Sequence, residues 1–241
     1  TERFAVQLPS HIVVRSNHNR DALLQIGVPE ERISLIPCGI DWQMIQDLDP
    51  AEGDWDLAFV GRLIKAKNVG LLLEGVANLL ATHPNIRCAI VGEGPERPHL
   101  EQLAANLDLG SHVIFLGRLE EAQDVYALIK STKVFVTPSR REGFNITALE
   151  ANACGTPVVT IDHPQNATTD LIENGENGWV CAPDPQSMSR CVARLLSDPP
   201  LLERMSETSL RFSEKFDWNN TAQQEEKLYR SLISGQSGTR T

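Results

Sequence analysis

The chain has 241 residues, of which 41% are hydrophobic and 22% charged, and its formal net charge is -10. This composition argues against disorder, and no apolar run approaches the roughly 20 residues that a membrane helix needs. Proteins that bind nucleic acids in general have a clustered excess of Lys and Arg, so the acidic balance argues against that class too.

The five cysteines are odd in number, and no two of them form a Cys-x-x-Cys pair. Neither a disulfide framework nor a zinc site is therefore indicated. No secretory signal is recognised at the start of the sequence. We expect reduced thiols and a cytoplasmic protein.

The first predicted unit is small. Residues 12–14, 21–27 and 32–37 have the patterns of a strand, a helix and a strand, and they end in the turn PCGID. The acidic stretch that follows, 42–53, is interpreted as a linker. The unit is too short to be a domain of its own.

From residue 54 to residue 215, short β-rich apolar runs alternate with amphipathic stretches, which is typical of βαβ units and a parallel sheet. A polar surface loop is expected from Asp162 to Thr169, and a last amphipathic helix over 216–234 precedes a tail at 235–241. The sequence predicts an α/β fold with a Rossmann-like, doubly wound parallel sheet. Its strands are expected at 55–61, 85–92, 112–117, 133–138, 156–161 and 178–183, and its helices at 68–83, 95–107, 121–130, 145–154, 185–197 and 199–212.

Glycines and cations follow several of these strands. In an open α/β sheet, ligands bind beyond the carboxyl ends of the strands. Glycine lets the backbone approach a ligand, and a helix N-terminus offers free amides, so a diphosphate fits such a rim. Arg62 and Lys67 would add charge-assisted hydrogen bonds of roughly 1.5–3 kcal/mol each. The alternative is that Arg62, Lys65 and Lys67 form a solvated turn.

Two carboxylates, Glu142 and Glu150, flank the segment GFNITAL. On a single helix they would lie about 12 Å apart along the axis, which fits poorly with the paired carboxyls of a glycoside hydrolase. We therefore expect separate roles: Glu142 near a sugar, and Glu150 accepting hydrogen bonds from a ribose diol. The alternative is that Glu142 is a charge at a helix N-terminus and Glu150 an exposed helix residue.

In the order and spacing of its motifs the chain resembles the retaining, nucleotide-sugar-dependent glycosyltransferases of family 4, which have the GT-B fold of two facing Rossmann-like domains. The resemblance covers nearly all of residues 10–235. It implies that 54–215 is the carboxyl-terminal donor-binding domain, that 1–41 is the end of the acceptor domain with the interdomain link, and that 216–234 crosses back to a missing first domain. The matching segments are FVGRLIKAKN, AIVGEGP, FLGRL, VTPSRREGFNITALEANACGTPVV and ENGENGWV.

The resemblance also implies roles for single residues. Arg62 and Lys67 would bind the donor diphosphate and stabilise the departing nucleotide, so that no cofactor and no metal ion are expected. Glu142 would lie near the transferred sugar, and Glu150 would bind the ribose. Arg62, Lys67 and Glu142 are thus the predicted catalytic residues. The other predicted donor-binding groups are Arg118, near the base, and the backbone amides of Gly143, Phe144, Asn145 and Ile146.

The sequence departs from the family pattern at Asn145, where many members have glycine. This residue either alters the approach of the backbone to the sugar or adds its amide to donor recognition. His11 and His18 are expected in surface or capping roles. The Asp54-Trp55-Asp56 sequence has the outline of a metal-binding D-x-D motif, but it lies at the start of a strand, and no metal site is predicted.

The implied reaction is the transfer of a hexose from a UDP- or GDP-sugar to a sugar or lipid-linked acceptor, with retention at the anomeric carbon. The acceptor would bind through the missing first domain, so this chain alone would bind nucleotide but transfer little. The full enzyme would be cytoplasmic, free or peripheral at the inner face of the membrane. Two alternatives are a nucleotide-sugar-binding module without catalysis and a GT-B nucleotide-sugar epimerase.

Overall fold

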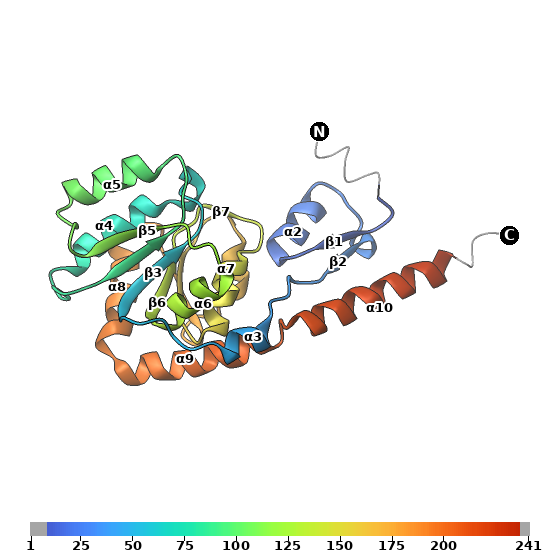
Figure 1. Cartoon of the computed structure of the whole chain (residues 1–241). Coiled ribbons are helices and arrows are strands. Elements are labelled where there is room, and N and C mark those ends of the chain that lie inside the picture. The colour runs from blue at the N-terminus through green and yellow to red at the C-terminus, as the bar shows by residue number, and fades with distance from the viewer. Residues whose placement is uncertain (1–8, 237–241) are drawn as a thin grey trace.

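A computed structural model describes residues 9–236, and its centre is a six-stranded sheet in which all neighbouring strands are parallel (Figure 1). The strand order is β10-β8-β6-β3-β4-β5, so the direction in which the chain adds strands reverses between β3 and β6. The predicted α/β fold with a parallel sheet is confirmed. The strands are β3 (Trp55–Val60), β4 (Cys88–Val91), β5 (Val113–Gly117), β6 (Thr132–Thr137), β8 (Val158–Ile161) and β10 (Gly178–Cys181).

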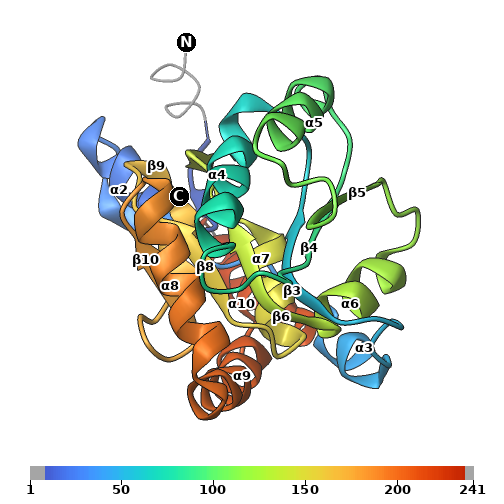
Figure 2. The same cartoon turned by 90° about the vertical axis from the view of Figure 1, so that its left-hand side faces the viewer.

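Helices cover both faces of the sheet (Figure 2). Successive residues of a strand face opposite sides, so Leu57 and Phe59 enter one core and Ala58 enters the other. The first core is covered by α4 (Val69–Leu79), α5 (Arg97–Asn106) and α8 (Pro185–Ser197), and the second by α3 (Trp42–Asp47), α6 (Ala122–Lys130) and α7 (Ile146–Ala153). Helix α9 (Pro199–Glu214) packs against α7 and α8.

A smaller unit lies beside this sheet. Its strands β1 (Ile12–Val14) and β2 (Ile33–Leu35) pair in parallel, and α2 (Asn17–Gln25) and the short 3-10 helix η1 (Glu30–Arg32) connect them. The long helix α10 (Trp218–Gln236) runs away from the sheet and under this unit (Figure 1). An ion pair of 2.8 Å joins Arg15, just after β1, to Glu225 on α10.

The two chain segments that connect this unit and α10 to the sheet touch each other. The amide of Ile40 donates to Phe216 O, and the amide of Trp218 donates to Ile40 O, each at 2.9 Å. Gly39 lies so close that a Cβ there would be 3.0 Å from the Trp218 Cα and from the Thr221 Oγ1. The PCGID turn and the start of α10 therefore form one junction.

Two stretches that were predicted to lack regular structure contain short helices or strands. Helix α3 occupies the start of the stretch interpreted as a linker, because Ile45 is fully buried in the second core and Asp41 caps the helix. The segment expected as a polar surface loop holds β9 (Gln165–Asn166) and the 3-10 helix η3 (Ala167–Leu171). Strand β9 pairs with β7 (Arg141–Glu142). Residues 237–241 of the predicted tail lie outside the described residues.

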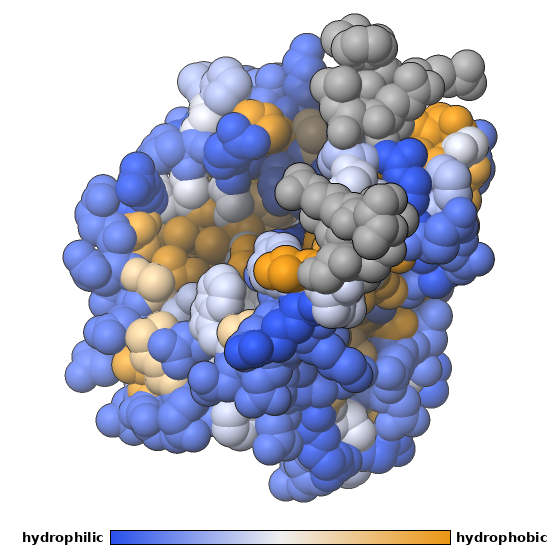
Figure 3. All heavy atoms as spheres, turned by 90° about the vertical axis from the view of Figure 1, so that its right-hand side faces the viewer, coloured by the Kyte–Doolittle hydropathy of each residue, from blue (hydrophilic) through white to orange (hydrophobic). Residues whose placement is uncertain are grey.

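Several apolar areas mark the face from which α10 projects (Figure 3). On α10, Trp218, Tyr229 and Ile233 are each more than half exposed. A groove of about 510 Å³ separates β2 from α10 and is lined by Leu35 and Leu228, among others. Within residues 9–236, no helix has the length and apolar character that crossing a membrane requires.

Candidate functional site

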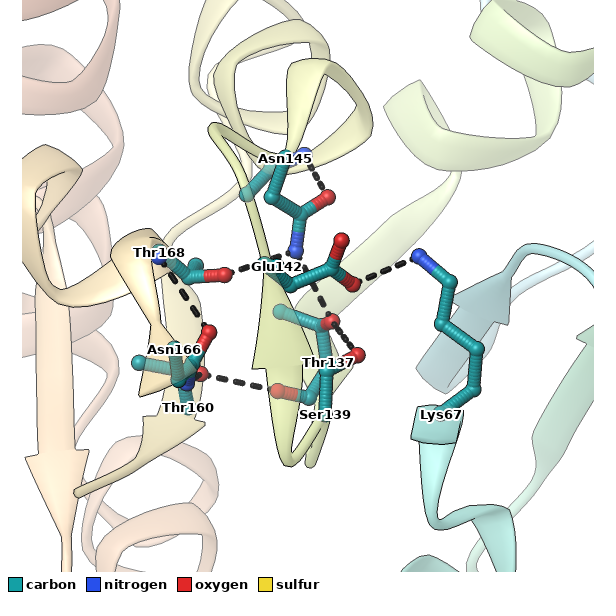
Figure 4. Close-up of polar contacts among 9 residues, drawn as sticks. Lys67, Thr137, Ser139, Glu142, Asn145, Thr160, Asn166 and Thr168 are labelled. Carbon is teal, nitrogen blue, oxygen red and sulfur yellow. Dashed lines mark hydrogen bonds and ion pairs between the residues drawn. The ribbon is translucent and has the colours of Figure 1, made fainter. Parts of the chain in front are cut away.

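Lys67 and Glu142 meet at the point where the strand order reverses. The short 3-10 helix η2 (Lys65–Lys67) follows β3, and Glu142 follows β6. The Lys67 Nζ donates to the Glu142 Oε1 at 2.5 Å (Figure 4). The side chains are 20% and 11% exposed, so both charges are largely withdrawn from water. Ligands of open α/β sheets bind at such a reversal, and here the reversal holds an ion pair that is only partly exposed.

Arg62 is close to Lys67 in the sequence, but it takes no part in the Lys67–Glu142 ion pair. Its side chain is exposed and makes no hydrogen bond or ion pair with residues 9–236. The Lys67 side chain passes Gly61, where a Cβ would lie 3.7 Å from the Lys67 Cε. Arg62 therefore offers an uncompensated positive charge next to a lysine that is already paired.

The glycines after β4 have a structural role that the sequence did not show. A Cβ on Gly92 would lie 1.9 Å from the Gly61 carbonyl oxygen, and one on Gly94 would lie 2.3 Å from the Leu63 carbonyl oxygen. Both residues also have positive φ, 133° and 159°. These two glycines let the loops after β3 and β4 pack backbone to backbone, whatever ligand lies above them.

Asn145 forms the N-terminal cap of α7. Its φ is 67° and its ψ 72°, a left-handed conformation that favours glycine and that asparagine tolerates better than most residues. Its Nδ2 donates to the Thr137 Oγ1 at 3.0 Å and to the Thr168 Oγ1 at 2.9 Å, while its Oδ1 accepts from the Ala148 amide (Figure 4). The side-chain amide is thus fully used inside the protein.

The backbone beside Asn145 has donors to spare. Among the described residues, the amides of Phe144 and Asn145 donate to no protein acceptor. The Phe144 side chain is buried in the second core and fixes the position of this loop. Ile146, the first residue of α7, is exposed. Free amides at a helix N-terminus attract anions.

A buried polar layer, which the sequence analysis missed, lies under the Glu142 loop (Figure 4). The Asn166 Nδ2 donates to the Thr160 Oγ1 at 3.0 Å and to the Ile161 carbonyl at 2.9 Å. Thr168 and Asn166 belong to the stretch that was expected on the surface, and both are buried. That expectation was wrong because the polar side chains satisfy one another and the backbone instead of water. The run of Asn and Thr in NATT was the sequence feature that could have indicated a buried hydrogen-bonded layer.

Glu150 has a partner of its own, separate from the Lys67–Glu142 pair. The Tyr126 hydroxyl, on α6, donates to the Glu150 Oε1 at 2.8 Å. Burial raises the pKa of Glu150, while this hydrogen bond lowers it. Burial likewise raises the pKa of Tyr126, and the Glu150 charge adds to the shift. The two glutamates therefore have different partners, and Tyr126 is a partner of Glu150 that the sequence gave no reason to single out.

The remaining predicted residues are scattered. Arg118 follows the edge strand β5, is exposed, and pairs loosely with Glu120 at 3.7 Å. Asp56 accepts from Lys133 at 2.8 Å at the start of β3. His11 hydrogen-bonds to Ser34 in the small unit. In the described part of the chain, no three His, Cys, Asp or Glu side chains gather where they could hold a metal ion.

The small unit also reaches the site. The Ser16 Oγ donates to the Gly143 carbonyl at 2.8 Å, and the Asn19 Nδ2 donates to the same oxygen at 3.0 Å. The amide of His18 donates to Asp170. The carbonyl of the residue after Glu142 is thus held by two donors from the start of α2.

Known proteins resemble this chain over most of its length. D-inositol 3-phosphate glycosyltransferase of Corynebacterium urealyticum is 34% identical over 186 residues, 73% of this chain and 43% of that protein. Glycogen synthase of Mycobacterium tuberculosis is 31% identical over 241 residues, 98% of this chain and 57% of that protein. The structure of Anabaena HepE with UDP and glucose has a TM-score of 0.84 at 22% identity, covering 95% of this chain and 66% of that one.

The chain spans about half the length of the two curated relatives. The family model for glycosyl transferases group 1 matches residues 41–211, which include the whole six-stranded sheet and the Lys67–Glu142 pair. The chain therefore belongs to the glycosyl transferases of group 1, and its parallel sheet is that of the GT-B glycosyltransferases.

Proposed function

We propose that this chain is the donor-binding portion of a retaining glycosyltransferase of family 4, which transfers a hexose from a UDP- or GDP-sugar to a sugar or lipid-linked acceptor. The observation that carries the proposal is the ion pair of Lys67 and Glu142 at the strand-order reversal, beside the free amides that begin α7. Membership of the family supplies the transfer reaction. The site supplies charged groups and free amides that suit the charges of this reaction.

The donor diphosphate would bind between Arg62, Lys67 and the amides of Phe144 and Asn145. Hydrogen bonds to the cations contribute roughly 1.5–3 kcal/mol each, and the helix dipole contributes about 0.3–1 kcal/mol, so the cations dominate the affinity. Arg62 has no competing partner among the described residues. Lys67 would share its charge between Glu142 and a phosphate oxygen, and the phosphate would then lie close to the carboxylate.

This arrangement suits a transfer in which the nucleotide leaves and the acceptor attacks from the same face. Negative charge then develops on the departing diphosphate, where Lys67 and Arg62 stabilise it. Positive charge develops at the anomeric carbon, where the negative charge of the Glu142 carboxylate would stabilise it. Glu150 would accept from the ribose hydroxyls, with Tyr126 as its neighbour.

The nature of the donor and acceptor rests on relatives. The HepE structure contains UDP and glucose, and the curated relatives are named for glycogen synthesis and for transfer to an inositol phosphate. These names support a hexosyl donor and a hydroxyl acceptor. Because the chain spans about half of those relatives, the acceptor would bind to a domain that precedes it, next to the small unit and α10.

Calorimetric titration with UDP, GDP, UDP-glucose and GDP-mannose tests the donor site. We expect saturable binding of one nucleotide, and Arg62→Ala should weaken it at least tenfold, about 1.4 kcal/mol. The control Arg211→Ala removes an exposed cation from α9 and should change nothing. Glu150→Ala should weaken the nucleotide as much as its sugar conjugate.

The same titration is repeated on a protein that includes the preceding domain. Binding by the longer protein alone would mean that the donor site needs both domains, and it would not count against the proposed donor site. If neither protein binds any of the four ligands at millimolar concentration, the proposal fails. Retention is tested by the configuration of the anomeric proton in the product of that longer protein. An inverted product would contradict the proposed mechanism but not the donor site.

A further inference from the structure

Two cysteines share a pocket that is separate from the Lys67–Glu142 pair. Cys181 ends β10, the edge strand of the sheet, and Cys191 lies on α8, the helix that follows. Cys181 is buried, and Cys191 is partly exposed. The pocket has a volume of about 360 Å³ and is lined by Trp179, Cys181, Ala182, Ser187, Arg190, Cys191 and Arg194.

The two thiols line the same pocket, and each shifts the ionisation of the other. The Cys181 Sγ donates to the Thr160 carbonyl oxygen at 3.2 Å, which fixes the position of this thiol on the sheet. Met188, Val192 and Leu195 on α8 pack into the first core, so the helix face that presents Cys191 is held against the sheet. The pair is therefore built into the packing of α8 on β10.

The pocket is positively charged. The Arg194 guanidinium lies over the Trp179 ring, 4.8 Å from its centroid, and the Arg190 Nη2 donates to the Ser187 Oγ at 2.7 Å. Neither arginine forms an ion pair with a carboxylate among residues 9–236. The charge of Asp184 acts on both Cys181 and Arg190, and the Asp184 Oδ1 accepts from the Ser187 amide at 2.7 Å.

These surroundings distinguish Cys191 from the other thiols. The neighbouring Cys181 thiol lowers the pKa of Cys191 to about 7, against the effect of burial, and the charges of Arg190 and Arg194 lower it further. Burial raises the pKa of Cys38, and it raises the pKa values of Cys88 and Cys154 to about 12. A lowered pKa favours the thiolate near neutral pH, and the thiolate is the nucleophilic form.

We propose that Cys191 and Cys181 form a redox-active dithiol, in which Cys191 reacts with a low-molecular-weight disulfide and Cys181 then closes an intramolecular disulfide. The Cys191 thiolate attacks one sulfur of the small disulfide, an S–S bond forms, and one thiolate leaves. Cys181 loses its proton and attacks the Cys191 sulfur, and the second thiolate leaves. The two cysteines lose two electrons and two protons, and the small disulfide is reduced to two thiols.

Oxidised glutathione suits this pocket because Arg190 and Arg194 can bind its carboxylates. In the proposal the oxidised chain has β10 tied to α8 across ten residues of sequence. The reaction needs no group of the Lys67–Glu142 site, so it stands independently of the proposed transfer.

Incubation of the intact chain with oxidised glutathione, followed by alkylation and non-reducing peptide mapping, tests the proposal. We expect one Cys181–Cys191 disulfide and a mass lower by two hydrogen atoms. Cys181→Ser should instead stop at a mixed disulfide between Cys191 and glutathione. Cys191→Ser should yield neither product, and Cys38→Ser, the matched control, should behave as the wild type.

Iodoacetamide labelling, first of the unmodified chain, gives a second measure of the reactivity of Cys191. At neutral pH we expect Cys191 to react at least about five times faster than Cys38 or Cys154, after allowing for the lower nucleophilicity of a low-pKa thiolate. Its rate should rise through about pH 7. Arg190→Gln with Arg194→Gln should move this rise to higher pH. Equal labelling rates, or a stable glutathione adduct without disulfide in the wild type, would overturn the proposal.

Discussion

Glu142 and Glu150 are separated by seven residues and meet partners of different charge. Glu142 accepts from the cationic Lys67, and Glu150 accepts from the neutral hydroxyl of Tyr126. A cation compensates the charge of a carboxylate that is withdrawn from water, whereas a hydroxyl does so only in part. Ionisation of Glu150 is therefore coupled to folding.

The sign of that coupling follows from the raised pKa of Glu150, whose main cause is burial. The folded chain holds this proton more tightly than the unfolded chain does. The contribution to stability is present below the ordinary glutamate pKa of about 4.3 and is lost as the pH rises through the raised value. Glu150→Gln keeps an oxygen for Tyr126 and cannot ionise. We expect the gain in unfolding free energy of Glu150→Gln over the wild type to be larger near pH 7 than near pH 4.

Urea unfolding of both proteins at several pH values measures this difference. Glu207→Gln, which changes an exposed carboxylate on α9, is the matched control and should follow the wild type at every pH. Parallel curves for Glu150→Gln and the wild type would show that Glu150 titrates normally in the folded chain.

At the scale of elements, the loops that end β3 and β4 depend on residues without side chains. Gly92 and Gly94 allow these two loops to pack on each other, and Lys67 reaches Glu142 from the loop that they support. The position of the cation is thus set by backbone packing in the neighbouring strand connection. A change at Gly92 should affect the fold before it affects any ligand.

We expect Gly92→Ala to lower the unfolding free energy by about 3 kcal/mol or more, since the new Cβ meets a carbonyl oxygen at 1.9 Å and the φ is 133°. Gly110→Ala is the control, because a Cβ there meets no atom within 4 Å, and it should change stability by no more than about 1 kcal/mol. Chemical denaturation measures both. Equal effects of the two substitutions would refute this account of the loops.

The sequence predicted all six strands of the main sheet because each is a short apolar run bounded by turn residues. Their carboxyl ends then located the site, since parallel strands present those ends at one edge. Short elements escaped detection. Helix α3 has six residues, and β7 and β9 have two each, too few for a hydrophobic period to emerge.

Side-chain pairing was equally hidden. The sequence pointed to Lys67 and Glu142 separately, as groups for a ligand, but a hydrogen bond across 75 residues leaves no trace in local spacing. Tyr126 looked like any aromatic residue of an amphipathic helix. Asn145 was flagged for its residue type, and its left-handed φ of 67° now explains why a glycine or an asparagine suits that position.

At the scale of the whole molecule, two chain segments join the sheet to the small unit and α10, and they touch at Gly39. The amides of Ile40 and Trp218 each donate across this junction. Any movement of the small unit relative to the sheet must therefore bend both segments together. The junction has no room for a side chain at its centre.

Gly39→Ala should lower the unfolding free energy by about 1–3 kcal/mol, because the added methyl group lies 3.0 Å from the Trp218 Cα and the Thr221 Oγ1. Hydrogen exchange locates the effect. The amides of Ile40 and Trp218 should exchange faster than in the wild type, while those of the central strand β3 keep their protection. Unchanged exchange at Ile40 and Trp218 would show that the junction accommodates the methyl group without strain.

The contacts that hold the Gly143 carbonyl also set an order in time. Ser16 and Gly143 are 127 residues apart, and Arg15 and Glu225 are 210 residues apart. At a synthesis rate of roughly 5–20 residues per second, Glu225 follows Arg15 by about 10–40 s. Helix α2 has no buried residue of its own in the finished fold. The small unit is therefore made before the residues that it contacts, and its hydrogen bonds to Gly143 can form before α10 has been synthesised, whereas its ion pair with Glu225 cannot.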